Sequence, residues 1–552
     1  MSIFIKRTLV LTIAALSALS SQAFREDRAV TVAVISLNDF HASFLTDTAQ
    51  GVPGAGSLWL CIDSLRRVYP NSIVVSAGDN FGGSYFSRKT DDKYLPWFFG
   101  RLGITLSVIG NHEFDNGQTF LADRWQSSPE KPSDWSITYV CANVTDSTGR
   151  IPSYMQPVAL RSISIPGASP IRIAFSGLVT ATTPEQAAKD KVEGLVFSPD
   201  YAGVINALDQ SPTTHSLLDS ADIRLLMLHI GTEMHAGRPT WSLPGDAALF
   251  SGIDSTRYHG MLSSHSHKLV QGTFYGMPVV QGDCYGRYVS ILRFMVDTVS
   301  REVKPLDSEL CPVHHSNSQV AGKVEIDARI DSILQNTVDK GRALGELLTY
   351  CETSLRHDRN KRQTISSLGG MVCASYAAAA RTALHSKPHT PIIGMSHIGG
   401  IRANIERGPV RVIDAGQVLP FSNNVSLFRM TGKRLKELLT FGLNNRKYGR
   451  LQSSGMILTV SRSNNEEWPE YTITKAVYRD PSTGREQKIK DNKMYYVAAD
   501  DFMTHGGDGY PATFFDDTRL PLSLPLTSEA FFTFLKTFDK IGGDNTFGTV
   551  VQ

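Results

Sequence analysis

The sequence has little cysteine, and its six cysteines follow no recognisable spacing. No CxxC pair occurs, so a zinc site held by cysteine thiolates is not expected. Six cysteines permit about fifteen disulfide connectivities, and the sequence does not choose among them. The six are Cys61, Cys141, Cys284, Cys311, Cys351 and Cys373.

The chain also lacks a marked excess of charge of either sign. Its formal net charge is +2 and no pronounced polybasic run occurs, so nothing indicates a nucleic acid polymer or an acidic membrane as a partner. We find no convincing internal repeat or low-complexity tract. A hydrophobic content of 41% and a charged content of 20% are those of a globular protein. Because 552 residues exceed one ordinary core, two or more domains are expected.

The apolar run at the N-terminus is too short to span a membrane comfortably. Lys6 and Arg7 precede it, and the small residues Ser21 and Ala23 follow it. This order predicts a signal peptide over residues 1–23, with an uncleaved anchor as the alternative. No cysteine lies near the cleavage site, which argues against a lipid anchor. We therefore expect an exported, soluble protein, secreted or periplasmic, with no membrane span after cleavage.

The first half of the chain contains six short, mostly apolar runs separated by helix-like or irregular stretches. Near-continuous apolar strands are typical of sheets that are covered on both faces, so the pattern predicts an α/β fold. The runs are residues 30–37, 71–78, 104–110, 171–178, 223–230 and 276–282.

A change of pattern near residue 320 predicts a second domain. Apolar residues at roughly helical spacing, without proline, predict a linking helix over residues 321–345. A further apolar helix at 368–384 and a new α/β unit from residue 391 follow. The predicted domains are 24–320 and 346–552. The apolar residues of the linking helix are Ile326, Ile330, Ile333, Leu334, Val338 and Leu344.

Polar side chains of the metal-ligand type follow five separate strand-like runs of the first half. The carboxyl ends of strands in an open α/β sheet converge on one crevice, so these side chains are expected to meet. Carboxylate, imidazole and amide groups together suit Zn²⁺, Mn²⁺ or Co²⁺, and a set of this size can hold two ions. The residues are Asp39, His41, Asp79, Asn111, His112, Asp115, His229, His265 and His267.

None of these residues would be informative alone. A single histidine at a strand end is more often an ordinary hydrogen-bonded residue than a ligand. The pair His265 and His267 is a weak indication, because alternate residues of one strand face the same side. The absence of cysteine from the set disfavours a structural zinc site.

The motifs NDFH, AGDN, GNHEFD and SHSH, with His229, resemble the motif set of the calcineurin-like metallophosphoesterases. Their order and spacing resemble the 5′-nucleotidase and UDP-sugar hydrolase family. In the second half, GGIRANI, VLPFSNN and FMTHGGDGYP resemble that family's substrate domain. The resemblance implies a four-layer α/β/β/α metallophosphoesterase domain, a linking helix and a second α/β substrate-binding domain.

The resemblance also implies roles for individual residues. Two divalent ions, Zn²⁺, Mn²⁺ or Co²⁺, would activate water and hold the phosphoryl oxygens. His112 would be the catalytic histidine, oriented by Asp115, and Glu113 is left as a local structural contact. One ion would be held by Asp39, His41, Asp79 and His267, and the other by Asp79, Asn111, His229 and His265.

In the substrate domain, the resemblance assigns Phe421 and Phe502 to stacking on the base, which contributes about 1–3 kcal/mol per base in nucleic-acid binders. Asp508 would accept hydrogen bonds from the ribose. The guanidinium groups of Arg402, Arg359 and Arg362 would face the phosphate. The alternatives are buried core aromatics for Phe421 and Phe502 and a solvated basic turn for Arg359 and Arg362.

The sequence departs from the family pattern at three positions. Ser264 stands where the family usually has glycine before the HxH pair, and His397 and Gly370 each stand where it has asparagine. The serine is compatible with the family structure if its backbone angles are ordinary. The other two departures concern substrate contacts rather than the metal ligands.

The leading hypothesis is an exported two-metal phosphohydrolase that converts nucleoside 5′-monophosphates to nucleoside and phosphate, with UDP-sugars as further substrates. The alternatives are a 2′,3′-cyclic nucleotide 2′-phosphodiesterase with 3′-nucleotidase activity and a catalytically inactive nucleotide-binding surface protein. We expect a monomer whose partner is a small nucleotide. Residues 324–344 are the predicted hinge.

Overall fold

The computed structural model describes residues 25–47, 50–127, 133–243, 245–246, 250, 252–339, 342–358, 365–385, 390–464, 469–480, 483–516, 518–542 and 547–552. The predicted signal peptide, Arg359 and Arg362 lie outside these residues. The chain forms two compact units. Unit 1 contains the chain up to Gly82 and Asp92–Ala328, and unit 2 contains Gly83–Asp91 and Arg329–Gln552.

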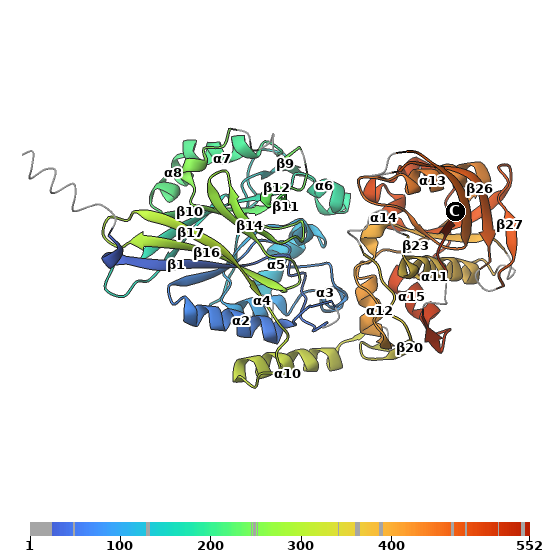
Figure 1. Cartoon of the computed structure of the whole chain (residues 1–552), viewed down its shortest axis with the longest axis horizontal. Helices are drawn as coiled ribbons and strands as arrows, with labels where there is room; N and C mark the ends of the chain where they lie inside the picture. The colour runs from blue at the N-terminus through green and yellow to red at the C-terminus, as the bar shows by residue number, and fades with distance from the viewer. Residues whose placement is uncertain are drawn as a thin grey trace, which may run out of the picture. The chain divides into compact units, whose positions relative to one another are not determined.

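Two β-sheets packed face to face form the centre of unit 1 (Figure 1). Alternate residues of their strands, such as Val32 and Val34 on one sheet and Ile171 and Ile173 on the other, fill the core between them. The seven-stranded sheet has the order β17 (Val303–Pro312), β16 (Tyr288–Asp297), β1 (Ala29–Leu37), β2 (Ser72–Ser76), β3 (Leu106–Val108), β4 (Thr138–Val140) and β6 (Met155–Gln156). The six-stranded sheet has the order β14 (Val270–Phe274), β15 (Met277–Gln281), β13 (Gly260–Ser263), β10 (Ile223–His229), β8 (Ile171–Val179) and β7 (Val158–Ile163).

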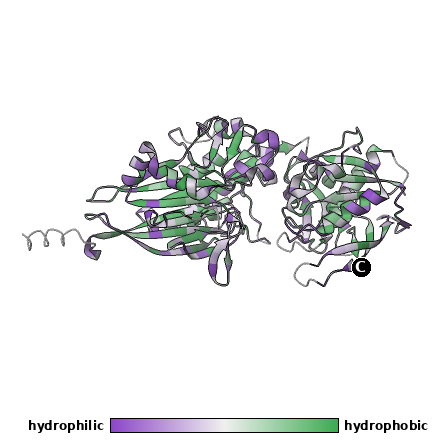
Figure 2. Ribbon diagram, turned by 90° about the horizontal axis from the view of Figure 1, so that it is seen from above, coloured by the Kyte–Doolittle hydropathy of each residue, from purple (hydrophilic) through white to green (hydrophobic). Residues whose placement is uncertain are grey.

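Helices cover the outer faces of both sheets, which gives the four layers α/β/β/α (Figure 1). A second core lies between the six-stranded sheet and its helices, where Leu226 and Leu228 pack with Ile205 and Leu218. The hydrophobic residues concentrate in the strands, as Figure 2 shows. The helices of the unit are α2 (Ala55–Val68), α4 (Leu95–Leu102), α5 (Gln118–Ser127), α6 (Thr183–Gln186), α7 (Tyr201–Gln210) and α8 (Pro212–Asp219).

Unit 2 is a second α/β body built on three small sheets. Its central sheet has a core on each face, because neighbouring residues such as Ile392 and Ile393 point to opposite sides. The strand orders are β23 (Val425–Thr431), β28 (Met494–Asp500), β21 (Ile392–Ser396), β24 (Gln452–Ser453); then β22 (Gly408–Arg411), β20 (Leu347–Cys351), β29 (Lys540–Ile541); and β27 (Glu486–Lys488), β26 (Tyr471–Arg479), β25 (Met456–Arg462), β30 (Val550–Val551). The helices are α11 (Ser367–Ala383), α12 (Val412–Val418), α13 (Gly432–Leu443), α14 (Asp501–Thr504) and α15 (Thr527–Leu535).

Three two-stranded sheets complete the described strands. They are β5 (Val144–Asp146) with β9 (Leu195–Phe197), β11 (Thr232–His235) with β12 (Arg238–Trp241), and β18 (Val338–Asp339) with β19 (Arg342–Ala343).

The predicted linking helix is shorter than expected. Helix α10 covers Ala321–Asn336, and the prediction of helix up to residue 345 is wrong. The chain instead forms the β18–β19 hairpin, in which Val338 is 59% exposed, while Leu344 enters the core of unit 2. The apolar residues after 336 therefore matched a helical period without sharing a helix face.

One segment of the N-terminal half belongs to unit 2. Helix α3 (Tyr85–Thr90) begins at Ser84, whose side chain accepts a hydrogen bond from the Ser87 amide. The Tyr85 side chain is fully buried in the unit 2 core and meets the Phe532 ring edge to face at 5.8 Å. Arg88 donates a hydrogen bond of 3.0 Å to the Ser528 hydroxyl. No residue pattern near 83–91 indicates this association.

The expected α/β architecture, with a four-layer first unit and a second α/β unit, is confirmed. Within the residues that the structure describes, none of the helices has the length and apolar character needed to cross a bilayer.

Candidate functional site

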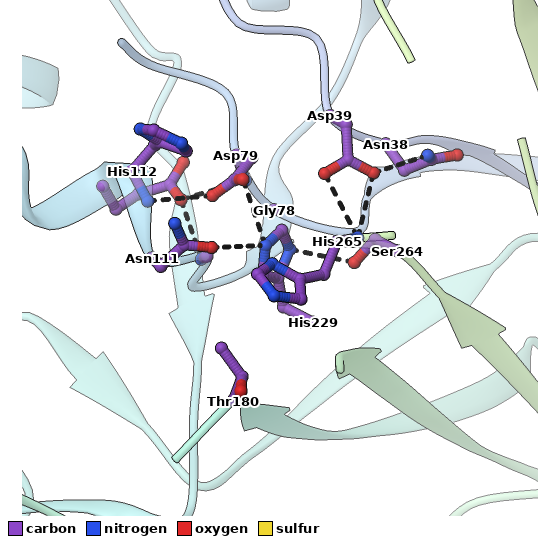
Figure 3. A network of polar contacts seen from close by, with 12 residues as sticks. Asn38, Asp39, Gly78, Asp79, Asn111, His112, Thr180, His229, Ser264 and His265 are labelled. Carbon is purple, nitrogen blue, oxygen red and sulfur yellow. Dashed lines mark hydrogen bonds and ion pairs between the residues drawn. The ribbon is translucent and has the colours of Figure 1, made fainter. Parts of the chain in front are cut away.

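The polar residues identified in unit 1 lie at or just beyond the carboxyl ends of neighbouring strands. Strands β1, β2 and β3 run parallel in one sheet, and β10 and β13 run parallel in the other. Asp39, Asp79 and Asn111 follow the first three strands, His229 ends β10, and the loop after β13 carries His265 and His267. The two packed sheets therefore bring all five strand ends to one place (Figure 3).

These side chains form two clusters that share the Asp79 carboxylate. The first contains Asp39, His41, Asp79 and His267, and the second contains Asp79, His229 and His265. In each cluster one ligand atom from every residue lies within 4.8 Å of the others. The first cluster has the four residues that the family resemblance implied, and the second has three of its four.

Asn111 belongs beside the second cluster, because its side-chain oxygen lies 3.2 Å from His229 Nε2. His229 Nε2 is also 3.2 Å from Asp79 Oδ2. In the first cluster, the Nε2 atoms of His41 and His267 are 3.2 Å apart. All seven predicted metal ligands thus lie together, in the two groups expected.

The pair His265 and His267 does not act as two residues on one strand face. Strand β13 ends at Ser263, and both histidines lie in the following loop with positive φ angles of 78° and 54°. The imidazoles therefore enter different clusters. The expectation based on strand alternation was wrong in its geometry, although both side chains reach the site.

Backbone strain concentrates at this site. Asp39, His41 and Asp79 have φ of 48°, 50° and 51°, so with the two loop histidines five of the seven predicted ligands are left-handed. Such conformations cost non-glycine residues about 1–3 kcal/mol each and persist where the surroundings fix them. Strain of this kind is typical of functional sites.

Close packing explains the glycine that ends the run before Asn111. A side chain at Gly110 would overlap Asp79 Oδ1, and one at Gly78 would meet the His229 ring. Glycine therefore lets the β2 and β3 ends approach each other closely enough for their polar side chains to share one site.

The donor set fits a divalent cation. His229 Nδ1 lies 2.9 Å from the Ala77 carbonyl oxygen, a position that favours an N–H there. A neutral ring would then direct its Nε2 lone pair at the oxygens of Asp79 and Asn111. That arrangement is favourable only with a proton or a cation between them, and carboxylate with imidazole suits Zn²⁺, Mn²⁺ or Co²⁺.

Electrostatics at Asp79 keep its carboxyl group ionised. Burial by itself would raise its pKa, but the imidazoles of His229, His112 and His41 outweigh burial and hold the pKa well below its usual range. Burial lowers the pKa of His229, yet the carboxylates of Asp79 and Asp39 raise it overall, to about 9. The cluster therefore attracts positive charge strongly, which a bound cation would supply in place of the proton.

His112 is held differently from the ligand histidines. It begins a short 3₁₀ turn, His112–Phe114, and its Nδ1 lies 2.8 Å from Asp115 Oδ2. Its backbone N–H donates to Asp79 Oδ1 at 2.9 Å, and its ring centroid is 4.9 Å from that of His41. The predicted contact with Asp115 is present, and the imidazole borders the first cluster without belonging to it.

Glu113 has a larger structural part than the local contact expected from sequence. Its buried carboxylate accepts hydrogen bonds from the backbone N–H groups of Gly110, Asp79 and Asn80 at 2.7, 3.0 and 2.8 Å. It therefore joins the loop after β2 to the loop after β3. The position of Glu113 directly after His112 in the sequence did not indicate this role.

Three further residues contact the predicted ligands. Asn38 donates to Asp39 Oδ2 at 2.8 Å and to the Gly282 carbonyl oxygen at 3.1 Å. The Ser264 hydroxyl lies 2.9 Å from His229 Nδ1 and is not left-handed, so serine replaces the family glycine without strain. The Tyr285 ring lies 5.5 Å from that of His41, a contact for which the sequence offered no signal.

In unit 2, His397 connects the predicted substrate residues. Its Nδ1 lies 2.6 Å from Asp508 Oδ2, and its ring centroid lies 5.0 Å from that of Phe502. It also lines, with Phe421, a shallow hollow that is open to solvent. The Arg402 guanidinium lies 5.6 Å from the Phe421 ring centroid. Of the four described candidates, Asp508 and Phe502 therefore each contact His397, and Phe421 lines the same hollow as His397.

Packing explains why Gly370 replaces the family's asparagine. Gly370 lies in α11, and a Cβ there would overlap the backbone of Gly548 near the C-terminus. No side chain fits at this position, so the substrate contact of the family cannot be made from it.

Comparisons with known proteins agree with the fold. The family model described as the 5′-nucleotidase C-terminal domain matches residues 344–514. The 5′-nucleotidase of Diplobatis ommata is 22% identical over 513 residues, which cover 86% of this chain and 82% of that protein. Residues 344–514 are therefore a 5′-nucleotidase C-terminal domain, and the chain as a whole is similar to 5′-nucleotidases.

Proteins similar to this chain differ in length. Endonuclease YhcR of Bacillus subtilis (strain 168) is 22% identical over 540 residues, but this chain covers only 40% of YhcR. The crystal structure of the 5′-nucleotidase precursor from Thermus thermophilus shares the fold, with a TM-score of 0.68 at 21% identity. That match covers 95% of this chain and 99% of the other.

Proposed function

We propose that this chain is a phosphohydrolase that removes phosphate from nucleoside 5′-monophosphates with the help of two divalent ions. The observation that carries the proposal is the pair of ligand clusters sharing Asp79, with the His112–Asp115 pair beside them. The similarity of the chain to 5′-nucleotidases supports the same reaction class. The ions are of the Zn²⁺, Mn²⁺ or Co²⁺ type.

The metal roles follow the two clusters. Asp39, His41, Asp79 and His267 would hold one ion, and Asp79, Asn111, His229 and His265 the other. Two such ions activate water for attack and neutralise charge on the phosphoryl oxygens. The chain's task is to fix these ligands, which Asn38 and Ser264 do through hydrogen bonds to Asp39 and His229.

His112 would act on the phosphoryl group itself. Asp115 accepts a hydrogen bond from its Nδ1–H and so directs Nε2 away from the carboxylate. A protonated Nε2 donates a hydrogen bond to the oxygen on which charge develops, either an equatorial oxygen or the leaving oxygen. Asp115 also stabilises the positive imidazolium in that state.

The substrate roles rest on unit 2. Phe421 and Phe502 would stack on the base, Asp508 would bind the ribose hydroxyls, and Arg402 would face the phosphate, together with Arg359 and Arg362. We further propose that the protein is exported to the periplasm or beyond and acts as a monomer. UDP-sugar hydrolysis is part of the proposal as a second activity.

The test is a phosphate-release assay of the purified protein with AMP, UDP-glucose, 2′,3′-cyclic AMP and ADP, with and without added Mn²⁺ or Zn²⁺. We expect release from AMP that a chelator stops and that added Mn²⁺ restores. Release only from 2′,3′-cyclic AMP would favour the cyclic phosphodiesterase. A metal-loaded protein that releases phosphate from none of them would favour an inactive binding protein.

A further inference from the structure

The feature of unit 2 that the proposed function does not use is the free end of His397. This residue is 5% exposed, and within the described residues its Nε2 has no hydrogen-bond partner. The nearest carboxylate oxygen, Asp500 Oδ1, is 3.8 Å away, which is too far for a hydrogen bond. The same imidazole lines the hollow beside Phe421. A buried donor without a partner is costly, and here it borders the space where a ligand would supply one.

The surroundings of His397 fix its charge and its orientation. Burial lowers its pKa, but the carboxylates of Asp508 and Asp500 outweigh burial and the nearby Arg402, and the pKa rises to about 9. The ring is therefore an imidazolium at neutral pH, with N–H groups on both nitrogens. Gly399 and Gly400 leave room for it, since a Cβ at Gly400 would lie 2.7 Å from Nε2.

We propose that His397 is a specificity-determining residue that offers its Nε2–H to the base edge and so selects bases with a carbonyl oxygen there. This role rests on the proposed function, and the favoured substrates are nucleotides of hypoxanthine, guanine or uracil. An imidazolium can only donate. An exocyclic amino group, as in adenine or cytosine, would place a second donor opposite it and leave both without an acceptor.

The test compares IMP with AMP, and UMP with CMP, since each pair exchanges one carbonyl for an amino group, and the neighbouring ring nitrogen changes from an N–H to an acceptor. For the wild-type protein at neutral pH we expect kcat/KM to favour IMP and UMP by about tenfold or more. In His397→Asn, whose amide can donate or accept, both ratios should fall close to one. His314→Asn, at an exposed histidine of unit 1, should keep the wild-type ratios.

The outcomes separate this inference from the proposed function. If the wild-type kcat/KM ratios of IMP to AMP and of UMP to CMP are near one, the role of His397 is wrong, whether or not the variant folds. Phosphate release from AMP in that experiment would leave the proposed function intact. Ratios that stay high in His397→Asn also overturn the role of His397. Failure to hydrolyse any of the four nucleotides would instead refute the proposed function.

A separate observation concerns the cysteines of unit 1. Cys61 on α2 and Cys311 on β17 have their sulfur atoms 3.8 Å apart, and both are partly exposed. The other four cysteines are buried. The hydrogen bond from the Cys61 thiol lowers the pKa of Cys311 to about 7, so a large part of Cys311 is thiolate at neutral pH.

We infer that Cys61 and Cys311 form a disulfide by exchange with a small or protein disulfide. The Cys311 thiolate attacks the donor disulfide, which gives a mixed disulfide and releases one thiolate. Cys61 then loses its proton to solvent and attacks the Cys311 sulfur, releasing the second thiolate. Two thiols of the chain are oxidised and one donor disulfide is reduced, so electrons balance.

Incubation of the reduced, folded protein with oxidised glutathione tests this inference. We expect a product two hydrogens lighter, a linked peptide containing Cys61 and Cys311, and a Tm several degrees higher than in the reduced protein. Cys61→Ser should instead retain glutathione on Cys311, and Cys351→Ser should behave as wild type. If both thiols of the wild type remain open to alkylation, or if glutathione persists on Cys311, the inference is wrong.

Discussion

At the scale of single residues, His112 differs from the ligand histidines by its partner. Asp115 holds its Nδ1, and its imidazole is a member of neither ligand cluster. We expect His112→Ala to lower kcat with AMP by about 10²–10⁴-fold, the usual contribution of a positioned acid or base. The metal content should stay at the wild-type value.

Phosphate release and metal analysis of the purified variant measure the two quantities. His215→Ala, at an exposed histidine on α8, is the matched control and should keep full activity. Full activity in His112→Ala would refute its role, and loss of metal would place it among the ligands.

The ion pair between His397 and Asp508 makes unit 2 sensitive to alkaline pH. The pKa of His397 is about 9 in the folded protein and near 6.5 in the unfolded chain. The ion pair therefore makes its full contribution to the free energy of unfolding only below about pH 6.5. Its contribution, on the order of 3 kcal/mol, should be lost as pH rises toward 9 and above. The difference in urea unfolding midpoint between wild type and His397→Asn should shrink from pH 6 through pH 7.5 to pH 9. A difference that stays constant with pH would contradict this role of the ion pair.

At the scale of elements, the contact between α11 and the C-terminal segment depends on Gly370. A Cβ at this position overlaps the Gly548 backbone, so Gly370→Ala should lower the free energy of unfolding by about 1–3 kcal/mol. Gly345→Ala is the control, because nothing lies within 4 Å of its Cβ position and its φ is not positive. The thermal unfolding midpoints of the two variants are compared with that of the wild type. Equal shifts in Gly370→Ala and Gly345→Ala would show that the structure relieves the overlap at no cost in stability.

The elements that the sequence predicted best are the buried strands. The run at 223–230 became β10 (Ile223–His229), since a continuous apolar run bounded by polar residues has few other solutions. The helix over 321–345 was only partly right. Val338 and Leu344 matched a helical period by chance, because one lies in an exposed hairpin and the other in the unit 2 core.

The gathering of the predicted ligands was predictable because their residue types and strand-end positions can be read in the chain, while their division between two ions came from the family resemblance. The supporting contacts were not. Glu113 holds the backbone of Asp79 from 34 positions away, and the Tyr285 ring reaches His41 from a distant loop. Such contacts depend on how closely the strand ends approach each other in space, and the sequence around each strand does not specify this distance.

At the scale of the whole molecule, Tyr85 makes a short N-terminal segment part of unit 2. Its ring fills the space left by Gly416, where a Cβ would overlap it, and it packs against Phe532. We expect Tyr85→Ala to cost about 3–5 kcal/mol, as for other large buried aromatics. The loss should appear as faster amide hydrogen exchange in α12 and α15, with little change in the sheets of unit 1.

Tyr350→Ala, at a 47% exposed tyrosine of the same unit, is the control and should change stability by no more than about 0.5 kcal/mol. Faster exchange confined to unit 1 after Tyr85→Ala would contradict the assignment of α3 to unit 2.

The chain passes between the two units at three points, near residues 82, 91 and 328. A single protease cut after α10 would leave α3 on the N-terminal fragment, still seated among unit 2 side chains such as Phe532 and Ser528. Recombination between the genes of related proteins would also have to keep α3 together with the rest of unit 2. A unit 2 inherited from a related protein would need its own counterpart of residues 83–91, so two separated stretches of the gene must be exchanged together.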